Sequence, residues 1–379
     1  MDFSLNETHT MIRDTARKFA EERIAPGTID RDEKEEFPRE IVREMGDLGF
    51  MGMMVPEEWG GSGLDTTSYV LALEEVSRVD ASVGVIMSVN NSLVCYGINK
   101  DGTQEQKERF LKDLASGRKL GAFALSEPEA GSDASNQRTT AVRDGESYVL
   151  NGSKNWITNG STADIVLVMA ATDRSKGAKG ISSFIVEKGS PGFAVAKKER
   201  KLGIRSSDTV SLSFTECRVP VANRIGGEGD GFRFAMKTLE GGRIGISAQA
   251  VGIAQACLDA SVRYARERKA FDKPIAGLQA IQFKIADMAT NIDASRMLML
   301  KAAALKDAGE PFGAEAAMAK LFASKTAVES ALEAIQIHGG YGYVREYLVE
   351  RYLRDAKITE IYEGTSEIQR IVIARSLLK

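Results

Sequence analysis

The spacing and type of the apolar residues change twice along the sequence, and these two changes limit the folds that the chain can adopt. Residues 1–120 carry apolar side chains at helical spacing with charges between them, as in 11–22 and 40–46. Residues 121–228 consist of short segments rich in β-branched and aromatic residues, bounded by Gly, Asn, Asp or Pro. Residues 229–379 return to helical spacing over longer segments. The order predicts an α+β protein with three domains at these boundaries.

The middle segment is predicted to form an antiparallel sheet. The predicted strands are 147–151, 164–170, 182–187 and 209–214. In the last of them Val210, Leu212 and Phe214 alternate with polar residues, which is typical of a half-buried strand. The connections are hairpin-like, so we expect a β-sandwich or β-barrel.

The C-terminal segment is predicted to form a four-helix bundle. Ile281, Ile285, Met288 and Ile292 recur at a spacing of four, three and four residues, which makes one apolar stripe along a helix. Glycines and a proline near 309–311 and 339–342 supply the breaks between helices. Long helices with short connections are the pattern of a bundle.

Composition excludes several classes of function. A net charge of −3 over 379 residues, without a basic cluster, argues against nucleic-acid binding. Three widely spaced cysteines and two histidines indicate neither a disulfide framework nor a metal site. The N-terminus lacks the basic and apolar regions of a signal peptide, and no uninterrupted apolar run approaches the ~20 residues of a membrane span. We therefore expect a cytoplasmic protein without membrane insertion, or a mitochondrial matrix protein if a transit peptide has been removed.

The segment 357–370 places Glu363 between two predicted helices. Gly364 can end the first helix because glycine tolerates positive φ. Ser366 and Gln369 have the spacing of a capping box for the second helix. A carboxylate on such a loop, next to a residue without a side chain, can face a ligand that approaches the backbone closely. The alternative is a solvated glutamate in an ordinary helix connection.

Four motifs precede this loop, and each is ambiguous alone. They are Leu-Ser-Glu-Pro-Glu-Ala-Gly-Ser-Asp at 125–133, Asn-Trp-Ile-Thr-Asn at 155–159, Arg-Glu-Arg-Lys-Ala-Phe-Asp-Lys-Pro at 266–274, and Gln-Ile-His-Gly-Gly at 336–340. Taken alone, the first motif could be a surface turn and the second a core tryptophan. The third could be a charged helix end, and the fourth could simply end a helix. Together, in this order and followed by Glu-Gly-Thr-Ser-Glu at 363–367, they resemble the acyl-CoA dehydrogenase family over nearly the whole chain. The resemblance is closest to the short-chain, butyryl-CoA type.

The resemblance implies FAD as the cofactor. In the family the residue matching Ser126 bonds the flavin ring edge, that matching Trp156 packs beside the ring, and that matching Thr158 hydrogen-bonds N5. The residues assigned to FAD in this way are Phe123, Leu125, Ser126, Gly131, Ser132, Trp156, Ile157, Thr158, Arg268, Gln279, Gln336, Ile337, His338, Gly339, Gly340, Thr365, Ser366 and Glu367. No Gly-x-Gly-x-x-Gly opens a βαβ unit, so a Rossmann-type site is not expected.

The family contacts to FAD come from two subunits. Arg268, Gln279 and 336–340 match residues that reach the FAD of a neighbouring subunit, which implies a homotetramer built as a dimer of dimers. Asp272 stands where glycine is common in the family, so the local turn can differ.

The implied reaction is α,β-dehydrogenation of an acyl-CoA, with Glu363 as the general base. Some relatives carry the base on an earlier helix, where this chain has Gly242. Ser132, Glu240, Arg243 and Gly364 are the residues expected to contact substrate. Glu240, which stands where short-chain enzymes usually have aspartate, could instead be a helix-surface acid, and Arg243 could simply pair with it.

Three alternatives remain beside a short-chain dehydrogenase that passes electrons to electron-transfer flavoprotein. The substrate could be a branched or cyclic acyl-CoA. The enzyme could use oxygen, although acyl-CoA oxidases are usually longer. The chain could be a non-enzymatic, DNA-associated relative, which the net charge of −3 argues against.

Overall fold

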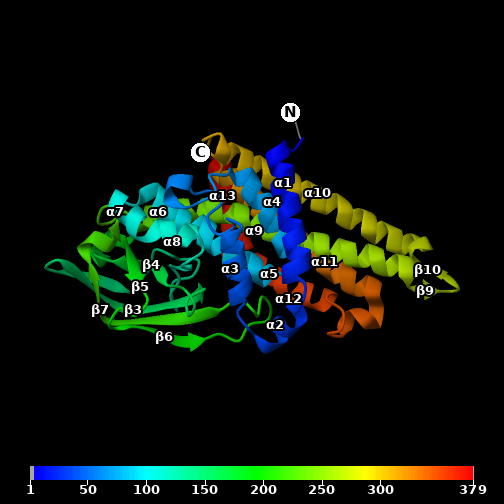
Figure 1. The fold of residues 1–379 in the computed structure, drawn as a ribbon, viewed down its shortest axis with the longest axis horizontal. Helices are drawn as coiled ribbons and strands as arrows, with labels where there is room; N and C mark the ends of the chain where they lie inside the picture. The colour runs from blue at the N-terminus through cyan, green and yellow to red at the C-terminus, as the bar shows by residue number, and fades with distance from the viewer. Residues whose placement is uncertain (1–3, 379) are drawn as a thin grey trace.

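Helices from the two ends of the chain pack side by side, next to a sheet domain. The computed structural model describes residues 4–378. In Figure 1 the sheet lies at one end of the long axis, and the N-terminal helices lie against the C-terminal bundle beside it. The order helix, strand, helix predicted from the sequence is confirmed.

The N-terminal region is helical, and most of helix α4 is buried. The side chain of Asp65 caps this helix by accepting a hydrogen bond from the Ser68 N–H. The helix packs against both α1 and α9, which together cover most of its side chains. The bounds are α1 (Glu7–Phe19), η1 (Ala20–Ile24), α2 (Thr28–Lys34), α3 (Arg39–Asp47), η2 (Glu57–Trp59), α4 (Thr66–Val79), α5 (Ala81–Ser88), η3 (Val89–Cys95), α6 (Tyr96–Asp101), α7 (Gln104–Gln106), η4 (Lys107–Leu111) and α8 (Lys112–Ala115).

One apolar helical stretch runs through α5, η3 and α6. By length and composition Ala81–Asp101 could cross a membrane, and no other helix among residues 4–378 meets that test. Its most apolar window is 94% buried inside the protein, as in the core helix of a globular fold.

The middle domain is an open, mixed sheet. The hydrogen-bonded path runs β6-β7-β3-β2-β4-β5-β8, and β1 pairs with β4 beside this path. The strands are β1 (Gly121–Ala124), β2 (Thr140–Asp144), β3 (Ser147–Thr158), β4 (Ile165–Ala171), β5 (Ile181–Glu187), β6 (Phe193–Lys198), β7 (Thr209–Pro220) and β8 (Arg224–Ile225).

The expectation of a purely antiparallel sheet is wrong, because β1 and β2 both pair with β4 in parallel. No pairing joins β6 to β8 among the described strands, so the sheet does not close into a barrel.

Strand β4 links two hydrophobic cores because successive side chains of a strand point to opposite faces. Ile165, Leu167 and Met169 belong to the large core shared with the helices. Val166 and Val168 belong to a smaller core inside the sheet domain. With both faces covered, this strand reads as a continuous apolar run rather than an alternating one.

The C-terminal region is built on α9, which spans 37 residues and is buried all round at its centre. It packs against α4, α10, α11 and α12. The bounds are α9 (Gly231–Glu267), β9 (Lys269–Ala270), β10 (Lys273–Pro274), η7 (Ile275–Gly277), α10 (Gln279–Asp307), α11 (Gly313–His338), η8 (Gly339–Tyr343), α12 (Val349–Thr359) and α13 (Ser366–Leu377).

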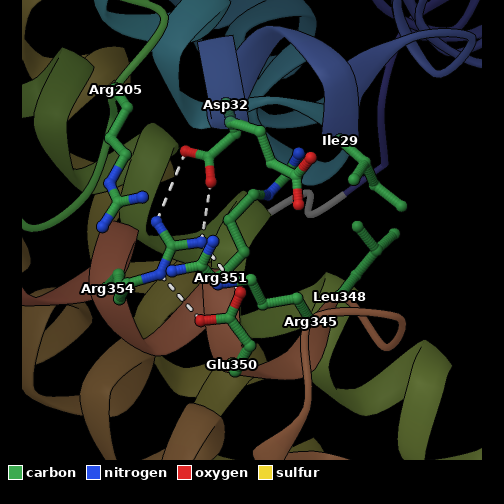
Figure 2. Close-up of a pocket in the computed structure, with 9 residues that line it drawn as sticks. Ile29, Asp32, Arg205, Arg345, Leu348, Glu350, Arg351 and Arg354 are labelled. Atoms are coloured by element: carbon green, nitrogen blue, oxygen red, sulfur yellow. Dashed lines mark hydrogen bonds and ion pairs between the residues drawn. The ribbon is translucent and has the colours of Figure 1, made fainter. Parts of the chain in front are cut away.

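An ion-pair cluster ties the three regions together (Figure 2). The Arg354 guanidinium pairs with Asp32 of α2 at 2.7 Å and with Glu350 of its own helix at 2.7 Å, and also donates to the Leu202 carbonyl of the sheet domain. The Ile204 N–H donates to Asp355, whose pKa is raised to about 7 by burial. The cavity inside this cluster measures about 10 Å³. That volume holds about one water molecule, so we assign the cluster a structural role.

We expect Arg354→Met to lower the free energy of unfolding by roughly 3–5 kcal/mol, because it leaves largely buried carboxylates without their cation. Arg218→Met is the matched control, since it removes an exposed ion pair with Asp144 that contributes about 0–1 kcal/mol. Urea denaturation of both variants measures the difference. Equal midpoints for the two variants would show that the cluster does not hold the domains together.

Candidate active site

Glu363 lies in a strained loop between α12 and α13. Helix α12 ends at Thr359, and Glu363 and Gly364 both have positive φ, of 51° and 94°. A left-handed φ is unusual for a glutamate and is a kind of strain that clusters at functional sites. The prediction that Gly364 ends the first helix is wrong, because that helix stops five residues earlier.

The predicted capping box is also wrong in its residues. Thr365, not Ser366, is the N-cap of α13, and its hydroxyl accepts from the Ile368 N–H. The Gln369 amide instead reaches back and donates to the carbonyls of Glu363 at 3.3 Å and Gly364 at 2.8 Å. Gln369 therefore fixes the loop from the side of α13.

The Glu363 carboxylate is turned toward the protein interior. Its Oε2 atom is buried, and no hydrogen bond reaches it among residues 4–378. Burial raises the pKa of Glu363 to about 7, against the opposing positive charges of Lys320 and Arg243. A carboxyl with a pKa near neutrality can take up and release a proton at physiological pH, as a general base must.

Gly242 on α9 makes room for this carboxylate. A Cβ atom at position 242 would lie 2.1 Å from Oε2 of Glu363 and 2.8 Å from Cδ2 of Leu93. The position that carries the base in some relatives therefore faces Glu363 directly, and the two positions cannot both hold a carboxylate without rearrangement.

Hydroxyl groups from two N-terminal helices lie near the same part of α9. The Tyr69 hydroxyl of α4 donates to the Ser88 Oγ of α5 at 3.1 Å. A Cβ atom at Gly245 would lie 2.7 Å from both oxygens. Burial raises the pKa of Tyr69, and the charge of Glu363 raises it further. Tyr69 was not singled out from the sequence, because only the packing of α4 on α9 brings it here.

Of the other predicted substrate residues, Glu240 and Arg243 lie on α9 and Gly364 lies on the Glu363 loop, whereas Ser132 lies on the loop between β1 and β2. Arg243 is buried, its Nε atom has no hydrogen-bond partner among the described residues, and burial lowers its pKa. No ion pair within 4 Å joins it to Glu240 in the described part of the chain, so the alternative in which the two residues simply pair is not observed. Glu240 instead lies close to Gly313, where α11 begins.

The sheet domain presents an exposed aromatic ring at a distortion of β3. Trp156 has a φ of 63° and lies at a register shift between Lys154 and Ile157. Its side chain is 63% exposed, so it is not a core tryptophan. Thr158 follows in the same strand. A large apolar plane left uncovered fits a planar ligand ring that packs on it.

A buried ion pair fixes the loop that follows β1. Lys154 has no exposed surface, and its ammonium donates to Glu127 at 2.7 Å and to the Leu125 carbonyl at 3.0 Å. Burial lowers the pKa of Lys154 to about 8, although the Glu127 carboxylate opposes this. Farther along the loop, Gly131 and Ser132 are exposed, and a Cβ atom at Gly131 would contact nothing within 4 Å. The loop base is rigid while its tip is open to a ligand.

Three parts of the predicted FAD site, Arg268, Gln279 and 336–340, lie far from this sheet. Helix α9 begins against Ser182 of β5 and ends at Glu267, about 55 Å away at 1.5 Å per residue. Arg268, whose guanidinium carbon lies 5.4 Å from the centre of the Tyr341 ring, and Gln279 lie at that far end, beside the β9–β10 hairpin (Figure 1). Within one chain, the two groups of predicted FAD residues are therefore not brought together.

The segment 336–340 lies at the same far end. The His338 side chain is buried, stacks on Tyr264 at 4.2 Å and donates from Nδ1 to the Ala334 carbonyl, so it has a packing role. Gly339 and Gly340 are exposed, and a Cβ atom at either would contact nothing within 4 Å. Their backbone is open to a neighbouring molecule.

Comparisons with known proteins cover the chain from end to end. The models for the N-terminal, middle and C-terminal domains of acyl-CoA dehydrogenases match residues 6–118, 122–217 and 229–378. The short-chain specific acyl-CoA dehydrogenase of Mus musculus, a mitochondrial protein, is 54% identical over 99% of this chain and 91% of its own length.

Two solved structures superpose closely. The butyryl-CoA dehydrogenase of Megasphaera elsdenii has a TM-score of 0.99 at 48% identity, covering 100% of both chains. A chain from work on the electron transferring flavoprotein of Acidaminococcus fermentans and flavin-based electron bifurcation has a TM-score of 0.99 at 52% identity, again covering 100% of both. With all three domain models and these relatives matched over nearly its whole length, the chain belongs to the acyl-CoA dehydrogenase family.

Proposed function

We propose that this protein is an FAD-dependent dehydrogenase that converts a short-chain acyl-CoA to the trans-2-enoyl-CoA. The observation that carries the proposal is the Glu363 carboxylate, which is buried, lacks a hydrogen-bond partner on Oε2 and has a pKa raised to about 7. Membership of the acyl-CoA dehydrogenase family supplies the reaction type.

In the proposed reaction Glu363 removes the α-proton of the thioester. No hydrogen bond involves the Glu363 N–H among the described residues, so this group is free to donate to the thioester oxygen as negative charge develops there. FAD, when bound, accepts the β-hydride. The loss of one proton to Glu363 and one hydride to the cofactor leaves the enoyl-CoA.

The residues of the sheet domain fit the flavin ring. The exposed Trp156 offers a plane, Thr158 offers a hydroxyl, and the open loop tip at Gly131 and Ser132 admits a ligand close to the backbone. Arg268, Gln279 and 336–340 would hold the FAD of a second subunit, since they lie at the other end of α9. We further propose the homotetramer of the family, built as a dimer of dimers.

We expect Arg268→Ala to lose most of its FAD during gel filtration and to shift toward smaller assemblies, because an arginine fork suits a pyrophosphate. Arg143→Ala, which changes an exposed residue of β2, is the control. It should keep its FAD and the size of its assembly. Flavin absorbance per chain and light scattering are the measurements. A monomer that keeps a full complement of FAD would contradict the two-subunit site.

The substrate is proposed to be short, straight and uncharged. Glutaryl-CoA dehydrogenases carry an arginine for the distal carboxylate at a place that Gly84 occupies here in an ungapped comparison. A Cβ atom at Gly84 would lie 2.2 Å from the Ser77 Oγ, so α4 packs closely on this buried glycine and a larger residue would require Ser77 to move. The butyryl-CoA dehydrogenase of M. elsdenii and the short-chain relative of M. musculus support the same substrate class.

We expect kcat/KM for butyryl-CoA to exceed that for glutaryl-CoA by about 10²-fold or more, because burying an unpaired carboxylate costs several kcal/mol. Steady-state rates with both substrates, and with isobutyryl-CoA as the branched alternative, measure this. A preference for glutaryl-CoA or isobutyryl-CoA would overturn the substrate assignment.

The physiological electron acceptor is proposed to be an electron-transfer flavoprotein. The nearly complete match to a chain from the A. fermentans work on that protein supports this choice. An oxidase is the competing function. Steady oxygen consumption with butyryl-CoA and no added carrier would favour the oxidase.

A further inference from the structure

Lys320 is a buried cation that has no ion-pair partner in the described part of the chain. It lies on the face of α11 formed by Ala316, Ala319 and Ala323, and none of its surface is exposed. No carboxylate oxygen lies within 4 Å of its ammonium among residues 4–378. Burying an unpaired charge is costly, so this lysine needs another source of stabilisation.

Among the described residues, the ammonium of Lys320 forms one hydrogen bond, to the loop that carries the proposed base. The Lys320 Nζ donates to the Gly364 carbonyl at 2.6 Å. The buried Lys154, in contrast, forms a direct ion pair with Glu127. The ammonium of Lys320 therefore binds the carbonyl of Gly364, the residue that directly follows Glu363.

The loop is held from two sides. Gln369 of α13 donates to the carbonyls of Glu363 and Gly364, and Lys320 of α11 donates to the Gly364 carbonyl. Glu363 and Gly364 both have positive φ, so their conformation depends on such outside support. The two hydrogen-bond donors differ in charge, since Lys320 is a cation and Gln369 is neutral.

That charge acts on the Glu363 carboxylate. Lys320 gives the larger and Arg243 of α9 the smaller of the two positive influences that lower the pKa of Glu363, while burial raises it. Burial likewise lowers the pKa of Lys320 to about 8, and Glu363 opposes this. The other titratable groups that act on this pair are Tyr69 of α4, Tyr362 of the loop itself, and Glu360 and Glu367 at the ends of the adjoining helices.

We propose that Lys320 is a positioning residue for the reaction, which fixes the Glu363–Gly364 turn through the Gly364 carbonyl and supplies a buried positive charge that favours the ionised Glu363. This inference rests on the proposed role of Glu363 as the base. It assigns Lys320 no contact with substrate or flavin.

Two variants separate the charge from the hydrogen bond. Lys320→Met removes both, and Lys320→Gln removes the charge but retains N–H donors. Lys325→Met, five residues farther along α11, removes an exposed lysine and is the matched control. Each protein is assayed with butyryl-CoA from pH 5.5 to about 9, with kcat and kcat/KM expressed per bound flavin.

For the wild-type protein we expect kcat/KM to rise with pH through about 7, because the base is inactive while protonated. This rise of kcat/KM with pH is the acid limb of the profile. In both Lys320 variants the acid limb should move to higher pH by about one unit or more, because the loss of a nearby positive charge raises the pKa of the Glu363 carboxyl. Lys320→Met should in addition have a lower pH-independent kcat than Lys320→Gln. Lys325→Met should match the wild type throughout.

A wild-type protein that binds FAD but does not act on acyl-CoA would count against the proposed function. An active wild type, with an acid limb that stays unshifted in folded Lys320 variants, would overturn the role of Lys320 alone. If neither variant keeps flavin and a cooperative melting transition, Lys320 is a structural residue and the proposal is equally refuted.

Discussion

Glu363→Gln should abolish most of the dehydrogenation while leaving the protein folded and yellow. The amide matches the carboxylate in size but cannot accept the α-proton, and general base catalysis is typically worth ~10²–10⁴-fold. The carboxylate Oε2 has no hydrogen-bond partner in the described chain, so the substitution breaks no contact to that atom. The rate of anaerobic flavin bleaching by butyryl-CoA is the measurement.

Binding must be checked separately, because a variant that fails to bind substrate would also fail to bleach. Perturbation of the flavin spectrum by enoyl-CoA product should persist in Glu363→Gln. Bleaching at close to the wild-type rate would place the base elsewhere, and Glu240 would be tested next. Loss of flavin or of folding would favour a structural role for Glu363 at the helix junction.

Gly242→Ala should have the second-largest effect, by displacing the proposed base, Glu363, rather than removing it. The new Cβ atom would lie 2.1 Å from Glu363 Oε2 and 2.8 Å from Leu93 Cδ2, which are both the ends of flexible side chains. These side chains can move aside, so we expect the fold to survive. A shift of about 1 Å in a catalytic group can cost ~10²-fold, and we expect a loss of that order in kcat.

Gly241→Ala is the control for this prediction, because it adds the same methyl group one residue earlier in α9. A Cβ atom there would approach only the Lys306 side chain, at 3.4 Å. Replacing a helical glycine by alanine adds up to about 1 kcal/mol of stability, so this variant should be active and slightly more stable. Equal activity of the two alanine variants would show that Gly242 does not define the position of the carboxylate.

The element types could be predicted from the sequence because their patterns are local. The stripe 281–292 lies in α10, and the run 164–170 lies almost entirely in β4. The length of β3 could not be predicted, since the strand continues to Thr158 through a residue with positive φ. The parallel pairing of β1 with β4 was also missed, because it joins segments about 40 residues apart and depends on tertiary packing.

The site was predictable only where residue types and spacing matched a family. Glu363 and Gly242 were selected that way, and the structure brings their positions into contact. Lys320 was missed because a lysine in a long helix normally faces solvent. The sequence of α11 nevertheless indicates that Lys320 is buried. Lys320 shares a four-three-four spacing with Ala316, Ala323 and Ala327, and so lies on a buried face of small residues. What that lysine contacts depends on the loop at 364, which no local pattern specifies.

The central claim is that this chain is an FAD enzyme that dehydrogenates a short acyl-CoA. The most direct test is anaerobic addition of butyryl-CoA to the purified yellow wild-type protein, followed at the flavin absorbance band, with mass analysis of the thioester. We predict bleaching within the first turnover and formation of the trans-2-enoyl-CoA that is two hydrogens lighter than its substrate. A flavin band that stays unchanged, with butyryl-CoA recovered intact, would contradict the account.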